Sequence, residues 1–233
     1  MKLAIMQPYF LPYIGYFQLI HAVDEFVVYD NIEFSKRGWV QRNRILMNGL
    51  DQMFSIPLKK DSDYRQICER RLADSFVAES QKILRKIESA YRKAPYFSSA
   101  MPVIEQCFTS HEKNLFQFIE HSLLIINRYL NIKTKITISS ELQTDDGLKG
   151  QKRIFAICHA LSAFHYINAI GGQNLYNQET FAAQGIQLFF IKSKPIVYPQ
   201  FGKTFVPNLS IVDVMMFNSI EKIHEFLNSY NLI

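Results

Sequence analysis

The sequence is poor in cysteine, and what it lacks narrows the classes of protein to which it can belong. Its three cysteines, Cys68, Cys107 and Cys158, are far apart and form no Cys-x-x-Cys pair. An odd number at such spacings excludes a disulfide framework and a cysteine zinc site, and it is typical of a reducing compartment. No run of about 18 apolar residues occurs, and glutamine and proline soon interrupt the apolar start of the chain. We therefore expect a cytoplasmic protein with no membrane partner.

Several catalytic and nucleotide-binding motifs are also missing. The chain has no Gly-x-Gly-x-x-Gly and no Gly-x-Ser-x-Gly. Gly202-Lys203-Thr204 resembles the end of a P-loop, but Val197 stands where that loop needs its first glycine. The six histidines are scattered, with none at a metal-binding spacing. The sequence therefore predicts no metal site.

The composition is that of a folded and moderately basic protein. With 48% apolar and 20% charged residues, a chain of 233 residues can bury a full core, and we predict a single domain over residues 1–233. The formal charge of +5 suits an anionic small ligand. Nucleic acid is an unlikely partner on this pattern, because the basic residues are dispersed and form no long run.

Short apolar runs alternate with helical patterns along most of the chain. The first unit is a strand at 2–6, a helix that Pro12 opens as its first residue, and a strand at 25–29. This order and spacing predict parallel strands joined by a right-handed crossover. The rhythm resumes with strands at 135–138, 166–170 and 187–191 and helices at 151–164, 179–183 and 220–229. We predict an α/β fold with an open, mostly parallel, Rossmann-like sheet.

A hairpin and a helical insert interrupt this rhythm. Two strands, at 40–47 and 52–58, flank Asn48-Gly49, which is a strong signal for a type I′ turn. Apolar residues at helical spacing then predict a helical insert at about 75–132. Within the insert, residues 109–112 predict a capping box before a long apolar helix.

Polar residues and glycines follow several of the predicted strands. They are Gln7-Pro8, Asp30-Asn31, Ser139-Ser140 and Gly171-Gly172. In open parallel sheets, ligands bind beyond the carboxyl ends of the strands. The convergence of these residues at one edge therefore predicts a ligand site there.

The loop after the first strand supplies the first candidate residues. Gln7 and Pro8 lead to a helix whose first free amides would face the ligand edge and attract an anion. Tyr13 and Tyr16 lie near its start, and Gly15 between them would let a ligand or another backbone approach closely. The alternative interpretation of Gly15 is that it only relieves packing between helix and sheet.

A basic segment at 36–44 supplies the second set. It places four cations in nine residues beside the single tryptophan of the chain. Arginine binds phosphate or carboxylate through paired hydrogen bonds, and Trp39 could stack on a base or a sugar. On a hairpin strand, Arg42 and Arg44 share one face and Asn43 lies on the other. The alternative is a solvated, charged loop with a buried tryptophan.

Two glycine-containing segments complete the candidate site. Residues 147–153 precede a predicted helix, and Lys152 and Arg153 are candidates for a further phosphate or nucleotide contact. Gly171-Gly172, directly after a strand, is typical of a backbone that approaches a ligand closely. Ordinary helix capping and a tight turn are the respective alternatives.

The chain also contains several long and specific motifs. They read AIMQPYFLPYIGYF at 4–17, FSKRGW at 34–39, RNR at 42–44, IGG at 170–172, YPQF at 198–201 and NLSIVD at 208–213. Together these motifs resemble the WbqC-like protein family over essentially the whole chain. One departure is Ala169, where we expect proline in many relatives.

The resemblance implies a role in making surface polysaccharides such as O-antigen. Members often accompany gene sets for amino-deoxy sugars, which implies a transferase or ligase that forms an acyl or amino-acyl amide on a nucleotide-linked amino sugar. A carboxylate is a poor electrophile, so that reaction needs an activated donor. The cofactor is left open, with ATP or an acyl donor as the candidates, and the implied partner is a nucleotide-sugar or nucleotide.

The opening of the chain also looks distantly like the nucleotidyltransferase fold. Where that fold has His-x-Gly-His, which stabilises charge on a phosphate, residues 13–16 read Tyr-Ile-Gly-Tyr. Tyrosine carries no positive charge at pH 7, which argues against ordinary adenylyl transfer. The enzyme hypothesis therefore has Lys36, Arg37 and Arg42 hold the phosphates, while Asp30 accepts a proton or holds a sugar hydroxyl.

A non-catalytic protein that binds a nucleotide or nucleotide-sugar is the alternative. The two tyrosines favour it, because a nucleotide cradle would remain without its catalytic histidines. The number of polar strand ends favours the enzyme, because a sensor needs fewer of them. Both hypotheses share ligand binding, and only the reaction separates them.

Overall fold

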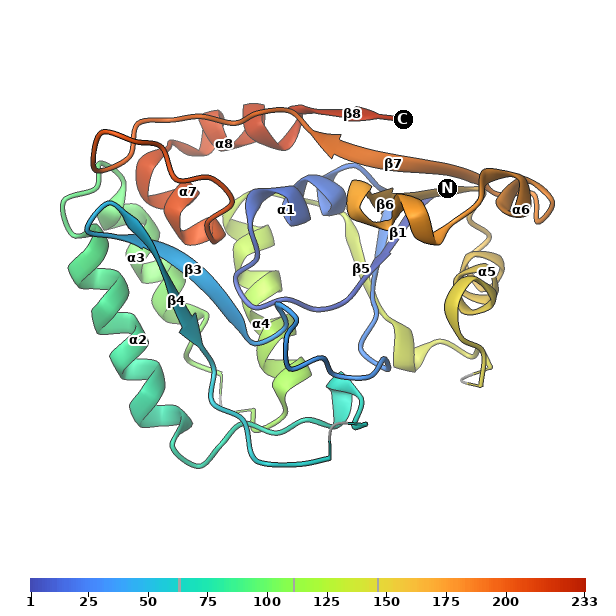
Figure 1. Cartoon of the computed structure of the whole chain (residues 1–233), viewed down its shortest axis with the longest axis horizontal. Coiled ribbons are helices and arrows are strands. Elements are labelled where there is room, and N and C mark those ends of the chain that lie inside the picture. Colours follow the sequence, from blue (N-terminus) through green and yellow to red (C-terminus); the bar gives the residue numbers. More distant parts are fainter. Residues whose placement is uncertain (63, 111, 146) are drawn as a thin grey trace.

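The chain folds around a mostly parallel sheet with helices on both faces (Figure 1). The structure, a computed structural model, describes residues 1–62, 64–110, 112–145 and 147–233. Over these residues the main sheet has the strand order β5-β2-β1-β6-β7-β8, and only β8 is antiparallel to its neighbour. The strands are β1 (Lys2–Met6), β2 (Glu25–Val28), β5 (Lys135–Ile138), β6 (His165–Ala169), β7 (Gln187–Ser193) and β8 (Tyr230–Leu232). The predicted α/β fold is therefore confirmed.

The strand order creates a topological switch point beside β1. From β1 the chain moves outward through β2 to β5 on one side of the sheet. It then returns to place β6 on the other side of β1, with Leu3 paired to Tyr166. The loops after β1 and β6 therefore leave the same edge of the sheet in opposite directions, which opens a crevice between them. The short β8 at the far edge was not predicted.

Alternate residues of the strands face two different hydrophobic clusters, as expected of parallel strands buried on both faces. Leu3 and Ile5 pack in one cluster with Ile154 and Phe181. Ala4 faces the larger cluster on the other side, which holds the insert and the C-terminal helices. The helices outside the insert are α1 (Ile14–His21), α5 (Gly150–Ala160), α6 (Gln178–Ala182), α7 (Ile211–Phe217) and α8 (Ile220–Leu227).

The hairpin and the helices between β2 and β5 follow the prediction. Strands β3 (Arg42–Met47) and β4 (Leu50–Ser55) form a two-stranded sheet of their own. Asn48 and Gly49 have φ angles of 54° and 78°, as the left-handed residues of a type I′ turn do. The helices that follow are α2 (Phe76–Tyr91), α3 (Phe97–Gln106) and α4 (Leu115–Tyr129). That they belong to one domain with the sheet stays a prediction.

The cap of α4 differs from the predicted capping box at 109–112. Residue 111 of that box lies outside the described residues. The N-cap of α4 is Asn114, whose side chain accepts a hydrogen bond from Gln117 N at 3.2 Å. Its Nδ2 also donates to Cys68 O at 2.6 Å, so asparagine holds the helix start and a neighbouring segment together.

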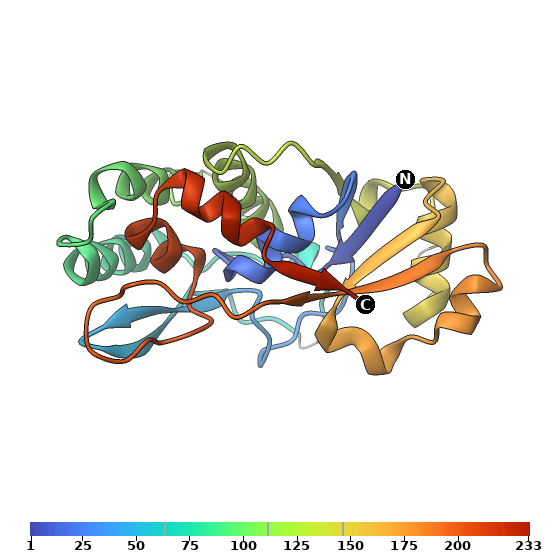
Figure 2. The same ribbon diagram turned by 90° about the horizontal axis from the view of Figure 1, so that it is seen from above.

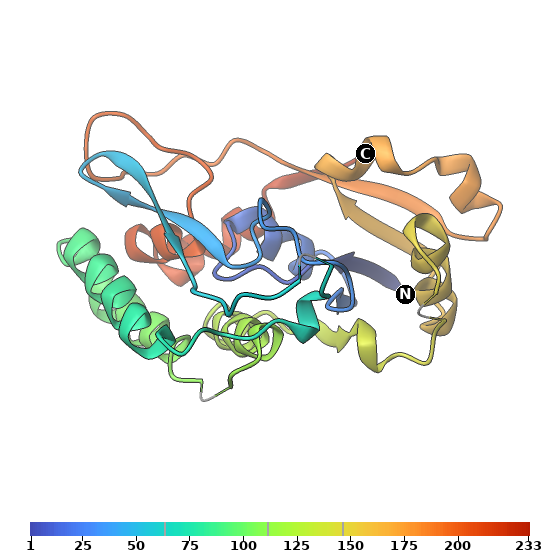
Figure 3. The same cartoon turned by 60° about the horizontal axis from the view of Figure 1, so that its bottom comes forward.

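Residues 194–210 run along the hairpin before α7 begins (Figure 2, Figure 3). At the end of this segment, Ser210 N donates to Arg44 O of β3 at 2.9 Å. The next residue, Ile211, donates its amide to Pro12 O at 2.8 Å. The hairpin, the start of α7 and the loop after β1 therefore meet in one place.

Candidate functional site

A cavity of about 520 Å³ lies at the topological switch point. It is bounded by the loop 7–13, which follows β1, and by the short helical turn η3 (Ile170–Leu175), which follows β6. Open parallel sheets bind ligands at this edge, and the volume is within the range of small-molecule sites. We call it the switch-point cavity. The structure brings together there the predicted residues Gln7, Tyr13, Gly15, Tyr16, Gly171 and Gly172.

Tyrosine side chains supply much of the polar lining of the switch-point cavity. The Tyr16 hydroxyl donates to Gln7 O at 2.9 Å. Burial raises the pKa of Tyr16 well above its ordinary value, and it also raises the pKa of Tyr9 and Tyr13. These hydroxyls are therefore neutral at physiological pH. No carboxylate, histidine, lysine or arginine lines the cavity among the residues that the structure describes.

The amino end of α5 and two glycines bring backbone groups to the same cavity. Gly150, the first residue of α5, lines it, and Lys149 gives this helix no side-chain cap. Uncapped amides at a helix start attract anions. A Cβ atom on Gly172 would lie 2.4 Å from Asn168 Nδ2, whereas one on Gly171 would meet no atom within 4 Å. A side chain at residue 172 would therefore displace the amide of Asn168, whereas Gly171 leaves open space.

The loop after β1 is held by the hairpin and by α7. Asn43 Nδ2 donates to Leu11 O at 2.7 Å and to Phe10 O at 3.2 Å. Ser210 Oγ donates to Leu11 O at 2.7 Å. Leu11 has a φ of 45°, a left-handed conformation that a leucine keeps only where its surroundings fix it. The contacts of Asn43, predicted to bind substrate, show it fixing this loop.

The start of α1 differs from its prediction. The helix begins at Ile14 with Tyr13 at the N-cap, two residues after the expected Pro12. The reason is tertiary, because the Pro12 carbonyl accepts from Ile211 N instead of from the first helical turn. A Cβ atom on Gly15 would lie 2.3 Å from the Tyr13 ring. Gly15 therefore makes room for the aromatic ring of Tyr13.

A second cavity, of about 330 Å³, adjoins the first. Both cavities are lined by Tyr9 and Tyr13. We call the second one the Trp39 cavity, because Trp39 is 40% exposed there and is not buried. The guanidinium carbons of Arg42 and Arg44 lie 5.8 and 5.4 Å from the Trp39 ring centroid, within the range of cation–π contacts. Its other lining residues are Pro12, Asn43, Arg44 and Asn208.

Arg42, predicted to hold phosphate, contacts its own loop. Its Nε donates to Gly38 O at 2.8 Å, and the guanidinium also donates to Arg37 O. Lys36 and Arg37 are exposed, and neither lines the switch-point cavity or the Trp39 cavity. The predicted cation cradle is therefore not gathered around the switch-point cavity, and the phosphate-binding role of these three residues stays a prediction.

Arg44, which was not among the predicted ligands, is the cation that lines the Trp39 cavity. It shares a face of β3 with Arg42, as the alternation of the strand predicts. Its Nη1 pairs with Asp51 at 3.0 Å, and Nη2 donates to Asn208 O at 3.4 Å. Its buried Nε has no hydrogen-bond partner among the described residues. The side chain stays 29% exposed, so a ligand can reach the guanidinium.

Asp30, predicted to accept a proton or hold a sugar hydroxyl, is buried at the end of β2. Its carboxylate accepts from Ser140 N at 2.9 Å and from Ser140 Oγ at 2.6 Å. Its backbone carbonyl accepts from Cys68 N at 3.0 Å. Asp30 is 1% exposed and does not line the switch-point cavity. These contacts tie the end of β2 to the end of β5, and the catalytic role of Asp30 stays a prediction.

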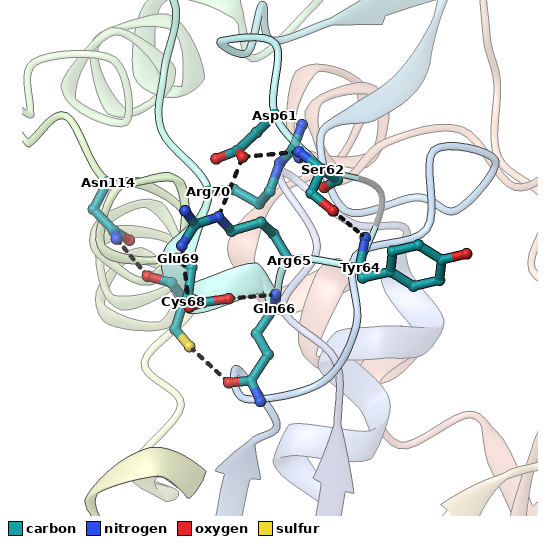
Figure 4. Close-up of polar contacts among 9 residues, drawn as sticks. All are labelled: Asp61, Ser62, Tyr64, Arg65, Gln66, Cys68, Glu69, Arg70 and Asn114. Carbon is teal, nitrogen blue, oxygen red and sulfur yellow. Dashed lines mark hydrogen bonds and ion pairs between the residues drawn. The ribbon is translucent and has the colours of Figure 1, made fainter.

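The segment 61–70 beside Asp30 is cross-linked by its own charged side chains (Figure 4). Arg65 pairs with Asp61 at 3.2 Å and with Glu69 at 3.3 Å. Arg70, which is 4% exposed, donates to the backbone of the same segment at 3.0 Å. The cations here are thus engaged within the segment.

The other predicted contacts lie outside the cavity lining. Lys152 is exposed on α5. Arg153 is 1% exposed, and its Nη1 donates to Asp145 O at 2.7 Å, which fixes the loop before α5. Pro8 is buried beside Gln7 and does not line the switch-point cavity. The adjacent Gly150 supplies the α5 contact to the cavity instead.

The buried carboxylate of Asp213 joins the hairpin to α2, α7 and the segment before α7. Asp213 accepts from Tyr91 Oη at 2.8 Å, from Tyr198 Oη at 2.7 Å and from Gln200 Nε2 at 2.6 Å. Tyr91 Oη in turn accepts from Leu46 N of β3 at 2.8 Å. Burial raises the pKa of Asp213, and these three donors oppose that effect. The network ties α2, β3, α7 and the segment 194–210 together.

Sequence reasoning missed several residues of the two cavities. The alternation of Arg42 and Arg44 along a strand was the signal for Arg44, because both had to share one face. Two of the others, Tyr9 and Asn208, stand in the family motifs at 4–17 and 208–213, but no spacing pattern marks them or the rest as cavity residues, because their positions depend on contacts between distant segments. The others are Tyr9, Asn168, Tyr176 and Asn208.

Two structural features are absent from the part of the chain that the structure describes. No cluster of three or more histidine, cysteine, aspartate or glutamate side chains there could hold a metal ion. No helix of those residues has the length and apolar character needed to cross a membrane.

The strand order and its cavity define the class: a doubly wound α/β protein with a cavity at the switch point. The model of the WbqC-like protein family matches residues 7–225, so the chain belongs to this family. The uncharacterized protein Rv1507c of Mycobacterium tuberculosis is 27% identical over 216 residues, which cover 92% of each chain. No solved structure gives a significant match, so the distant likeness to nucleotidyltransferases stays a prediction.

Proposed function

We propose that the protein forms an acyl or amino-acyl amide on the amine of a nucleotide-linked amino sugar, as a cytoplasmic transferase or ligase of surface-polysaccharide biosynthesis. The observation that carries the proposal is the switch-point cavity, which lies where open α/β sheets bind nucleotides. The reaction class comes from what the family motifs imply.

The lining of the switch-point cavity suits the parts of such a ligand. The uncapped start of α5 at Gly150 suits a phosphate group. Tyrosine hydroxyls and the Asn168 side chain suit the hydroxyls and amide groups of a sugar. Leu19 and Ile191 provide an apolar wall for a ring.

The proposed reaction relies mainly on bringing two substrates together. The lone pair of the neutral sugar amine attacks the activated acyl carbon, and a C–N bond forms. The bond from that carbon to a thiolate sulfur or a phosphate oxygen breaks, and the leaving group takes the electron pair while the amine nitrogen loses one proton to water. Fixing both reactants accelerates such a step. The neutral hydroxyls of Tyr9 and Tyr13 can donate to the oxygen on which charge develops.

A non-catalytic nucleotide-sugar binding protein is the second candidate function. It is favoured by one observation, the lack of an ionisable group other than tyrosine among the described residues that line the switch-point cavity. A general base would have to come from elsewhere in the protein or from water.

Binding is tested first, by calorimetry and by thermal shifts with nucleotides, nucleotide-sugars and nucleotide-linked amino sugars. The variant Gly172→Ala places a methyl group against Asn168, so we expect affinity to fall roughly 10-fold, or about 1.4 kcal/mol. Gln173→Ala, on the same turn η3, is the matched control, because Gln173 is exposed and does not line the switch-point cavity. Absence of binding by every one of these ligands would overturn the proposal.

The reaction is tested on the ligand that binds. The protein is incubated with a nucleotide-linked amino sugar and an acyl thioester, or with ATP and an amino acid. Mass spectrometry then measures whether the sugar gains the acyl group. Product formation supports the enzyme, whereas tight binding with no product from any donor selects the non-catalytic candidate.

A further inference from the structure

The Trp39 cavity has the chemistry of a second ligand site. We propose that it binds the adenine nucleotide portion of the acyl donor, next to the nucleotide-sugar in the switch-point cavity. This inference rests on the proposed function for the pairing of two substrates. The site itself rests on the residues that line it.

An exposed indole beside a guanidinium is suited to a purine that carries phosphate. Trp39 is 40% exposed, so part of its ring can stack on a base. Arg44 lines the same cavity, with its guanidinium carbon 5.4 Å from the ring centroid. Asn208 adds an amide group to the lining, whereas the amide of Asn43 is engaged by the loop after β1. An aromatic face and a cation are thus presented together.

The guanidinium of Arg44 has N–H donors that no described residue engages. Arginine carries five N–H donors, and the described partners of Arg44 engage one on Nη1 and one on Nη2. Its carboxylate partner, Asp51, is 46% exposed, so a phosphate can displace it into water. The guanidinium carbon of Arg42 also lies 5.8 Å from the Trp39 ring centroid, so two guanidinium groups are close to the ring. Their charge favours an anion beside Trp39.

The position of the cavity favours the acyl donor over another ligand. Tyr9 and Tyr13 line both cavities, so the reactive end of a ligand in the Trp39 cavity would meet the sugar at this shared wall. The activated donors that the reaction class allows include acyl-adenylates and coenzyme A thioesters. Both carry adenine and phosphate, and that shared chemistry is what Trp39 and Arg44 would recognise.

The single tryptophan makes the test direct, because intrinsic fluorescence excited at its red edge reports Trp39 alone. We titrate the protein with AMP and with coenzyme A, and free N-acetyltryptophanamide corrects for absorption. We expect saturable quenching by both probes. Tighter binding of coenzyme A would identify a thioester donor, and equal binding an adenylate. No saturable change with either probe would overturn the proposal.

Two variants assign the signal to the cavity. Arg44→Gln is expected to weaken the binding of AMP roughly 10- to 100-fold, as the loss of a charge-assisted hydrogen bond does. Arg85→Gln, an exposed arginine on α2, is the matched control and should change nothing. Should Arg44→Gln fail to fold, Trp39→Ala measured by calorimetry is the second variant, because alanine cannot stack on a base, and unchanged AMP affinity in it would contradict the proposal.

A final titration separates this inference from the proposed function. AMP is added after the protein has been saturated with the nucleotide-sugar that calorimetry identifies. Independent quenching by AMP supports two sites. Competition between the two ligands means that one ligand spans both cavities, which overturns the second site. Quenching by AMP in a protein that binds no nucleotide-sugar would retain the Trp39 site and overturn the proposed function.

Discussion

The two cavities share the side chains of Tyr9 and Tyr13, yet strand order forms one cavity and loop packing forms the other. The switch-point cavity follows from strand order, because the loops after β1 and β6 must part at that edge. The Trp39 cavity depends on the hairpin, the residues before α1 and Asn208, which come from three distant parts of the chain. One site is positioned by the sheet, and the other by the packing of loops around it.

The two cavities also differ in the chemical groups that line them. Uncharged tyrosines and backbone groups line the first over its described residues, and an arginine with an exposed tryptophan lines the second. Binding through shape and uncharged hydrogen-bonding groups depends less on salt than binding to a cation, and in the switch-point cavity only a phosphate at the start of α5 would add a salt-dependent contribution. A cationic site attracts phosphate and is screened by salt. This difference suggests that ligands for the two cavities can be distinguished by ionic strength.

The loop 7–13 connects the two regions and makes them interdependent. It forms one wall of the switch-point cavity, and Tyr9 and Pro12 within it line the Trp39 cavity. Asn43 and Ser210 hold its left-handed Leu11 in place. Whatever moves this loop must therefore change both cavities.

The largest expected effect follows from Asn43→Ala. The variant leaves Phe10 O without its side-chain donor and removes one of the two donors to Leu11 O. We expect the free energy of unfolding to fall by about 1–3 kcal/mol, and ligand binding to weaken in both cavities together. Denaturant unfolding and calorimetry measure the two effects.

Asn208→Ala is the control for Asn43→Ala, because Asn208 lines the Trp39 cavity alone of the two. It should spare the switch-point cavity. Loss of binding in only one cavity of Asn43→Ala would show that the loop does not couple them.

The second-largest effect is expected at the buried carboxyl of Asp213, whose contribution to stability depends on pH. Tyr198→Phe removes one of the three donors to Asp213, whose pKa burial already raises. The pKa of this carboxyl should then rise further, because its charged form is less well solvated. At neutral pH we expect a loss of about 1.5–3 kcal/mol in unfolding free energy.

The sign of this pH dependence follows from linkage. A group whose pKa is raised by folding favours the folded state below its unfolded pKa, and this contribution is lost as the pH rises through the folded pKa. The loss of unfolding free energy in Tyr198→Phe should therefore be larger at pH 7 than near pH 4. Because the network reaches β3, which carries Arg44, ligand binding in the Trp39 cavity should weaken as well. Tyr129→Phe on α4 is the control. An equal deficit at both pH values would mean that Asp213 is not the cause.

Local patterns were sufficient to predict the sheet, whereas the ligand site at its edge stays a prediction. Short apolar runs, the helical spacing and the Asn48-Gly49 turn are signals within a few residues, and the strands, helices and turn that they predicted are present. The convergence of Gln7 and Gly171-Gly172 followed from the rule that parallel strands end at one edge, and the structure brings these residues into one cavity.

The missed features depend on contacts that no local pattern contains. Pro12 was predicted as the first helical residue, but its carbonyl is held by Ile211, about two hundred residues later in the chain. Arg42 and Arg44 look equivalent in the sequence, and only the position of residues 37–38 and of Asn208 separates their partners. The partners of side chains on the hairpin therefore depend on tertiary contacts and cannot be predicted from local sequence.

Gly15→Ala tests the shared wall with little effect on stability. The added methyl group would overlap the Tyr13 ring, which lies at the junction of both cavities and must turn away. Alanine favours the helix by about 1 kcal/mol over glycine, which offsets part of the cost of moving the ring. We expect a melting temperature close to that of the parent protein, a shifted Trp39 emission maximum and weaker binding in both cavities. An unchanged emission maximum would show that the Tyr13 ring does not reach the Trp39 cavity.

The smallest expected effect is a difference in how often α5 and the helical insert open locally. Burial raises the pKa of the Cys158 thiol to about 12 and also raises that of Cys107, so each has little reactive thiolate at pH 8. A thiol-specific reagent should therefore label the partly exposed Cys68 first. Cys158 lies on α5, beside the switch-point cavity, and Cys107 lies in the insert.

The labelling rates of Cys158 and Cys107 then report how often α5 and the helical insert open. A ligand in the switch-point cavity should slow the labelling of Cys158 and leave Cys107 unchanged, because Ile154 on the same helix lines that cavity. Mass spectrometry of peptides follows each thiol separately. Equal slowing at both thiols would mean that the ligand stabilises the whole molecule, and that the two regions open as one unit.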